Sequence, residues 1–139
     1  MTTIQPYEMI ERLPTVEEHS ALWGAVGWGN INKSMTEPSL AHSVYGLIVR
    51  HEGKVIGMGR IVGDGVMYFY IQDVAVLPEF QGRGIGNIIM DQLLDYIRTH
   101  SYPGAFVGLF ASHGNDSFYE RYGFQNHAPG MTGMFKVIE

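Results

Sequence analysis

The chain has 139 residues, a hydrophobic fraction of 45% and no cysteine. This length is typical of one domain, so a single domain over residues 1–139 is expected, and the lack of cysteine excludes disulfides, thiolate catalysis and cysteine-based metal sites. The formal net charge of -5 argues against a broad nucleic-acid-binding surface.

The six histidines are scattered without the spacing of metal ligands, which predicts surface or capping histidines and no metal site. The N-terminal residues lack the basic start and apolar run of a signal peptide, and no segment approaches the length of a membrane span. We therefore expect a cytoplasmic protein that binds neither a membrane nor a nucleic acid.

The first half of the chain predicts helices followed by a β-hairpin. Thr15 begins a Thr-x-x-Glu capping box, so a helix is expected from there to about Val26. A shorter helix is expected over Glu37 to Ser43. Two apolar, β-branched runs, Val44 to Arg50 and Val55 to Val62, predict a hairpin.

The second half predicts strands on either side of a long helix. Val66 to Val76 is almost continuously apolar, as expected of a strand covered on both faces. Apolar residues at helical spacing predict a helix from Ile85 to Ile97, which a Ser-Tyr-Pro-Gly run ends. The remaining elements are a buried strand over Ala105 to Ala111, a short helix over Asp116 to Tyr122 and a last strand over Met134 to Ile138. This order indicates an α+β (mixed α/β) fold around one mostly antiparallel sheet.

Residues 81–86 place three glycines at alternate positions directly before the long helix, with no acid, hydroxyl or thiol among them. A dinucleotide-binding fingerprint would need Gly-x-Gly-x-x-Gly, and a P-loop would need Gly-Lys-Ser/Thr; both patterns are missing. A plain turn usually needs one left-handed glycine rather than three. The spacing favours a turn whose backbone amides, together with the helix dipole, bind a phosphate.

Two blocks of the sequence resemble the GNAT superfamily of acyl-coenzyme A-dependent N-acetyltransferases. The first, Gln81-Gly82-Arg83-Gly84-Ile85-Gly86, is similar to the family pattern Gln/Arg-x-x-Gly-x-Gly/Ala. The second, residues 115–124, has the family's Asn, aromatic-Tyr pair and Gly-Phe. The resemblance implies a sheet of about six to seven strands with helices on both faces, splayed strands around the coenzyme, and acetyl-CoA as cosubstrate without a metal.

The resemblance also implies which residues contact the coenzyme. Backbone groups of Val74, Ala75 and Val76 would pair with the pantetheine arm like an added strand. Asn115 would bond this arm from the far side, or cap its helix, or both. Phe118 and Tyr122 would pack that helix against the arm. The pyrophosphate would lie on Gln81, Gly82, Arg83, Gly84, Ile85, Gly86 and Asn87.

Tyr119 resembles the family's tyrosine that protonates the leaving thiolate, and a core tyrosine is the alternative. Where many relatives carry a Glu or His base, the corresponding face shows Tyr70 and Gln72. By period-two alternation Asp73 points to the opposite face, unless a bulge intervenes. We therefore expect a water held by Tyr70, Gln72 or a backbone carbonyl as the proton acceptor, with Asp73 as the second candidate.

The resulting prediction is an enzyme that transfers acetyl from acetyl-CoA to a primary amine of a small molecule, by direct attack in a ternary complex. A non-catalytic acyl-CoA binding or sensing domain and a protein lysine or N-terminal acetyltransferase are the alternatives. Trp28, Asn30 and Arg60 lie in segments that could border the acceptor pocket, although a core tryptophan and a surface arginine are the more common cases. The sequence leaves open which amine is the acceptor, which acyl chain is preferred and whether the chain forms a homodimer.

Overall fold

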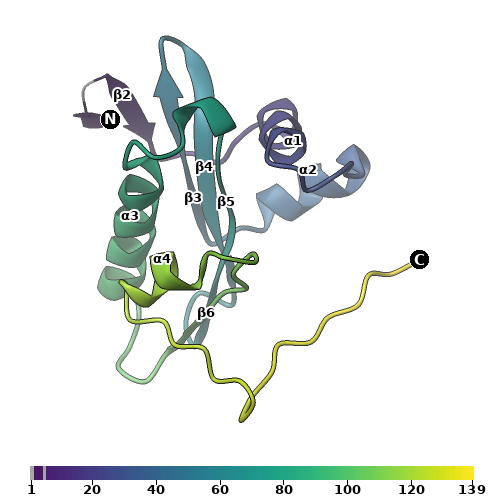
Figure 1. Cartoon of the computed structure of the whole chain (residues 1–139), viewed down its shortest axis with the longest axis vertical. Helices are drawn as coiled ribbons and strands as arrows, with labels where there is room; N and C mark the ends of the chain where they lie inside the picture. The colour runs from purple at the N-terminus through teal and green to yellow at the C-terminus, as the bar shows by residue number, and fades with distance from the viewer. Residues whose placement is uncertain (1, 5) are drawn as a thin grey trace. The chain divides into compact units, whose positions relative to one another are not determined.

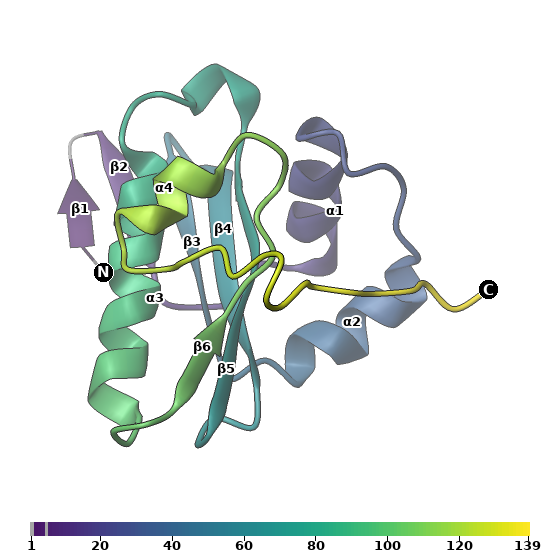
Figure 2. The ribbon, with the colours of Figure 1, turned by 60° about the horizontal axis from the view of Figure 1, so that its bottom comes forward.

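The computed structural model describes residues 2–4 and 6–139. The chain forms two compact units, one that ends at Val107 and one from Gly108 to Glu139. The first unit consists of an antiparallel sheet with α3 on one face and α1 and α2 on the other (Figures 1 and 2). Its strands are β1 (Thr2–Ile4), β2 (Tyr7–Ile10), β3 (Tyr45–His51), β4 (Lys54–Gly63) and β5 (Tyr68–Val76). Its helices are α1 (Val16–Ala25), α2 (Lys33–Ala41) and α3 (Ile85–His100), with a short 3-10 turn, η1 (Pro78–Phe80), after β5.

The antiparallel ladder contains the five strands β1 to β5 in chain order, fewer than the six to seven expected. The α+β class and the mostly antiparallel sheet are confirmed. A three-residue β6 (Phe106–Gly108) lies next to β5 in the strand order, and the Phe106 N–H donates to the Met67 carbonyl at 2.8 Å. The sequence did not predict β1 and β2, because runs of three and four residues carry too little alternation to be recognised.

Two predicted strands differ from the structure. The strand expected over Ala105 to Ala111 is shortened to β6, and the Phe106 side chain is 46% exposed rather than buried. The strand expected over Met134 to Ile138 is absent, because this stretch has no regular secondary structure. The Phe135 side chain there is 83% exposed, so its apolar surface is not buried against a neighbouring strand.

The helix starts are set by their capping residues. The predicted capping box of α1 is confirmed: the Glu18 N–H donates to Thr15 Oγ1 at 3.1 Å, and the Thr15 N–H donates to Glu18 Oε1 at 2.8 Å. Helix α2 begins at Lys33 rather than Glu37, because the Asn32 side chain accepts a hydrogen bond from the Ser34 N–H at 3.0 Å. No helix in the described residues is long and apolar enough to cross a membrane.

The core between α3 and the sheet depends on glycines in β4. The predicted period of α3 is confirmed, and its buried side chains are Ile85, Ile89, Met90, Leu93 and Ile97. A Cβ atom at Gly59 would lie 2.6 Å from Ile89 Cγ2 and 3.1 Å from Leu93 Cδ1. Only glycine therefore permits the observed approach of α3 to β4, which brings the start of the helix close to the end of β5.

The second unit contains one short helix, α4 (Asp116–Glu120), which ends before the predicted Tyr122. Aromatic rings pack around it: Phe118 lies 5.0 Å from Tyr119 and 5.8 Å from Tyr122, and Tyr119 lies 6.4 Å from Phe124, measured between ring centroids. These contacts give the unit a small aromatic cluster of its own.

Candidate functional site

Two of the three glycines in residues 81–86 adopt the unusual backbone conformation that their spacing predicts, and the third, Gly86, lies within α3. Gly82 and Gly84 adopt left-handed backbone angles, with φ of 77° and 82°. A Cβ atom at either position would meet no heavy atom within 4 Å, so backbone conformation rather than crowding requires glycine there. The loop surface at Gly82 and Gly84 is therefore open and leaves space for a bulky group.

The start of α3 offers backbone amides. Gly84 is the N-cap residue, no side chain of the described chain caps this end, and the first turn carries no acidic residue. The first bond within the helix joins the Ile88 N–H to the Gly84 carbonyl at 3.2 Å. The N–H groups of Ile85 and Gly86 precede that bond, at the positive end of a 16-residue helix. The Ile85 side chain is 1% exposed and anchors this turn in the core.

Two loop side chains hold the loop in place. Gln81 Nε2 donates to the Val76 carbonyl at 3.0 Å, which ties the loop to the end of β5. The Arg83 guanidinium lies 5.2 Å from the centre of the Phe80 ring and 3.5 Å from the Tyr7 hydroxyl.

The end of β5 directs backbone groups to both sides. The Leu77 N–H donates to the Ile56 carbonyl at 2.8 Å, and Val76 is the next residue in the register with β4. Because hydrogen-bonded and non-hydrogen-bonded pairs alternate in an antiparallel ladder, the Val76 groups point away from β4 and those of Ala75 toward it. The first unit thus brings the end of β5, the glycine loop and the start of α3 together.

A β-bulge interrupts β5 at Asp73. Met58 pairs with Ala75 and Arg60 pairs with Gln72, so Asp73 and Val74 together oppose Gly59. The bulge that was left open as the exception is therefore present, and Asp73 does not point to the opposite face from Gln72. The extra residue breaks the alternation, and Asp73 bonds to Arg60, which is the cross-strand neighbour of Gln72.

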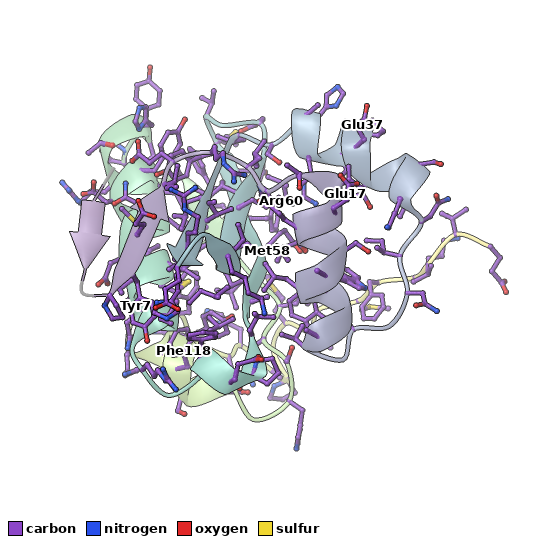
Figure 3. All side chains as sticks on the ribbon, turned by 90° about the horizontal axis from the view of Figure 1, so that it is seen from above. Tyr7, Glu17, Glu37, Met58, Arg60 and Phe118 are labelled. Atoms are coloured by element: carbon purple, nitrogen blue, oxygen red, sulfur yellow. The ribbon has the colours of Figure 1, made fainter. Side chains whose placement is uncertain are left out.

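Asp73 lies in a cluster of buried polar side chains. Its Oδ2 accepts a hydrogen bond from Arg60 Nε at 2.7 Å and lies 2.9 Å from His19 Nε2. The Asp73, Arg60 and His19 side chains are 9%, 13% and 2% exposed. Figure 3 shows Arg60 and Met58 on β4, on the side toward α1. Arg60 also donates to the Ser39 carbonyl, Ser39 Oγ and Ser43 Oγ at 3.0 to 3.2 Å.

Three expectations about single residues are corrected by these positions. His19 is buried in the core and not a surface or capping histidine. Arg60 is an ion-paired, mostly buried arginine and not a surface one. Trp28 is 37% exposed and packs edge-on against Trp23 at 5.1 Å, so it is not a core tryptophan. No sequence pattern signalled the cluster, because its histidine and aspartate are 54 residues apart.

The electrostatics of the cluster keep Asp73 ionised. Burial raises its pKa, but the hydrogen bond from His19 and the charge and hydrogen bond of Arg60 outweigh burial, so the pKa lies below the usual value. A carboxylate that already bonds two side chains is a weak proton acceptor, which makes Asp73 an anchor rather than a base.

We expect Asp73 to make stability depend on pH in the acid range. Its pKa is lower in the folded chain than in the unfolded chain, where aspartate titrates near about 3.9, so its stabilisation is complete above that value and is lost as the pH falls through the folded pKa. Asp73→Asn should flatten the dependence of the unfolding free energy on pH below about pH 4, as measured by urea unfolding. Asp91→Asn, at an exposed position of α3, is the control, and equal slopes in both variants would contradict the assignment.

A pocket of about 590 Å³ lies beside the cluster, between α2 and strands β4 and β5. Its lining residues are Met35, Pro38, Ser39, His42, Arg60, Val62 and Gln72. Gln72 thus faces a cavity, whereas the Tyr70 ring packs 5.6 Å from the Phe106 ring. Of the two side chains predicted to hold a water, Gln72 is the one that lines this pocket.

The remaining predicted site residues lie together in the second unit, around α4. Asn115 is the N-cap residue, but its side chain makes no capping bond; only its carbonyl accepts from the Tyr119 N–H at 3.4 Å. Burial raises the pKa of the Tyr119 hydroxyl, which therefore keeps its proton at neutral pH. The Phe118 ring packs beside the Tyr119 ring, and Tyr122 packs against Phe118.

Comparisons with known proteins show the family of this chain. The model of the acetyltransferase (GNAT) family matches residues 9–124. An uncharacterized N-acetyltransferase of Porphyra purpurea is 31% identical over 122 residues, which cover 85% of this chain and 69% of that relative. A probable acetyltransferase of unknown function from Staphylococcus aureus superposes with a TM-score of 0.90 at 30% identity, over 95% of this chain and 99% of that one. A GNAT family protein from Streptococcus pneumoniae gives a TM-score of 0.79 at 30% identity, over 95% and 98% of the two chains. The chain belongs to the GNAT family of acetyltransferases.

Proposed function

We propose that the chain transfers the acetyl group of acetyl-CoA to a primary amine of a small molecule, in a ternary complex. The observation that carries the proposal is the glycine loop: Gly82 and Gly84 are left-handed and open on one side, directly before a 16-residue helix with no acid in its first turn. Such a loop suits a pyrophosphate, because amides and the helix dipole supply positive potential without a charged side chain.

The residues present suit the coenzyme. The pyrophosphate would bind the amides between Gly82 and Gly86, and the Val76 backbone would bond the pantetheine arm as an added strand. The family resemblance assigns Asn115, in the second unit, to the pantetheine arm, and the side-chain amide of Asn115 makes no capping bond to its own helix. Acetyl-CoA supplies the activated acyl group as a thioester.

Proton transfer is assigned to the Tyr119 side chain and to a water. As the amine nitrogen attacks the thioester carbonyl carbon and the carbon–sulfur bond breaks, the Tyr119 phenol gives its proton to the departing thiolate. The raised pKa of Tyr119 keeps this proton in place before the reaction. A water held by Gln72 takes the proton of the amine, because Asp73 is occupied by Arg60 and His19. A non-catalytic acyl-CoA sensor would explain the loop but would not need Tyr119.

A small acceptor is favoured by charge and by the pocket beside Gln72. The net charge of -5 attracts cations, and Met35, Pro38 and Val62 line the pocket with apolar surface. An ammonium group on an aliphatic or aromatic body combines these properties.

The location of the protein in the cytoplasm stays a prediction.

The test is competition between acceptors at one acetyl-CoA concentration. We expect polyamines or arylalkylamines to give a higher kcat/KM than a lysine-bearing peptide, measured as release of free coenzyme A. The control omits the acceptor and measures hydrolysis of acetyl-CoA alone. A higher kcat/KM for the peptide would favour a protein acetyltransferase, and release that no amine increases would overturn the proposed activity.

A further inference from the structure

The buried cluster of Asp73, Arg60 and His19 has no direct part in the proposed reaction. Burying charges is costly unless they are paired and hydrogen-bonded, and a buried ion pair is weak evidence for stability. The Glu8–Arg50 pair of β2 and β3, with side chains that are 26% and 34% exposed, is the more ordinary arrangement. Stability alone is therefore not a sufficient explanation for the buried cluster.

The Asp73 backbone supplies one. Its φ of 57° is left-handed. Among the described residues other than glycine, only Asp73 and Glu52 have a positive φ. Aspartate tolerates this region better than most residues, but such a conformation persists only where the surroundings hold it. Both donors to the Asp73 carboxylate come from outside β5: His19 from α1 and Arg60 from β4. The cluster thus holds the side chain of the bulged residue from two directions.

The bulge in turn sets the phase of the rest of β5. Before it Gln72 pairs with Arg60, and after it Ala75 pairs with Met58. Without the bulge, the pairing of β5 with β4 after Asp73 would shift by one residue. The backbone groups and side chains of residues 75–77 would then each point in the opposite direction. The Val76 carbonyl would then no longer face the Gln81 amide, which bonds it at 3.0 Å and ties the glycine loop to β5.

The cluster also fixes one wall of the pocket beside Gln72. Arg60 donates to Ser39 of α2, and both residues line that pocket. One set of hydrogen bonds therefore joins the pocket wall to the strand edge that leads into the glycine loop.

We propose that Asp73, held by Arg60 and His19, is a positioning residue that maintains the bulge and so directs the Val76 backbone and the glycine loop toward the coenzyme. Its effect on acetyl-CoA binding rests on the proposed function. Its effect on the edge of β5 is a property of the chain alone, so the two can be tested separately.

The test compares two changes at Asp73 with one at a matched ion pair. Asp73→Gly accepts the left-handed backbone without steric cost but removes the carboxylate. Asp73→Asn keeps the size of the side chain and one acceptor oxygen. Arg50→Met is the control, because Arg50 Nε bonds Glu8 Oε1 at 3.0 Å in a more exposed pair. The readouts are amide hydrogen exchange over residues 74–77 without ligand, and the Kd for acetyl-CoA by calorimetry, both well below the melting temperature.

We expect Asp73→Gly to accelerate exchange over residues 74–77 and to raise the Kd for acetyl-CoA by about tenfold, with a smaller change in the same direction for Asp73→Asn. Arg50→Met should leave the exchange over residues 74–77 and the Kd for acetyl-CoA unchanged. A lower melting temperature is the only effect expected of it. Unchanged exchange and Kd in folded Asp73→Gly would overturn the proposal; if that variant does not fold, Asp73→Asn is judged by the same two readouts. If Asp73→Gly accelerates exchange but the wild-type chain does not bind acetyl-CoA, the positioning role is supported and the proposed function is overturned.

Discussion

Replacing Gly84 by aspartate should abolish the rise in melting temperature that acetyl-CoA gives the wild-type chain. A ligand at 100 times its Kd stabilises the folded state by about 2.7 kcal/mol. The aspartate side chain would occupy the open side of the loop, where a Cβ meets no atom within 4 Å, and would place a negative charge at the positive end of α3. Both effects oppose a pyrophosphate, so the shift measured by thermal unfolding should disappear.

The matched control for this variant is Gly104→Asp. Gly104 also has a left-handed φ, of 94°, and no atom within 4 Å of a Cβ, but it follows the other end of α3. Both substitutions carry the same backbone strain of about 1–2 kcal/mol and the same added charge. Gly104→Asp should therefore lower the melting temperature yet keep the ligand shift. A full shift in folded Gly84→Asp would remove the phosphate-site assignment.

Tyr119→Phe should lower kcat by about a hundred- to ten-thousandfold, the range for general acid–base catalysis, with little change in the affinity for acetyl-CoA. The loss falls on kcat because the missing hydroxyl acts on the departing thiolate rather than on the bound coenzyme. Steady-state kinetics and calorimetry of the two proteins would measure the two quantities.

The control for Tyr119→Phe is Tyr102→Phe, since Tyr102 is 71% exposed and follows α3 outside the site. It loses the same hydroxyl and should keep wild-type kcat. Unchanged turnover in Tyr119→Phe, with chemistry shown to be rate-limiting, would leave Tyr119 only its packing against Phe118 and Phe124.

The glycine loop could be predicted because its cause is local. Three glycines in six residues indicate unusual backbone angles, and Gly82 and Gly84 have them. The period of α3 and the capping box at Thr15 are local as well, since each depends on residues three or four apart in the sequence. The family resemblance added the coenzyme, which the glycines alone would have left as an unspecified anion.

The buried cluster could not be predicted because its cause is not local. Period-two alternation places Asp73 on the wrong face, and only the register with β4 shows the extra residue opposite Gly59. A single sequence likewise gives no sign that His19 reaches across to β5. The start of α2 was misplaced for a smaller reason: Asn32 caps the helix well before Pro38, which the prediction put in the first turn.

The contact between Gly59 and Ile89 has a consequence for how this sequence can change over evolutionary time. The space beneath α3 is shared between the two positions, because a methyl group at 59 would lie 2.6 Å from an atom of residue 89. A larger residue at 59 is therefore viable only in lineages where residue 89 has already become smaller. The pair determines how close α3, the helix that follows the glycine loop, comes to the sheet. The two sites are expected to vary together, and to vary in opposite directions of size.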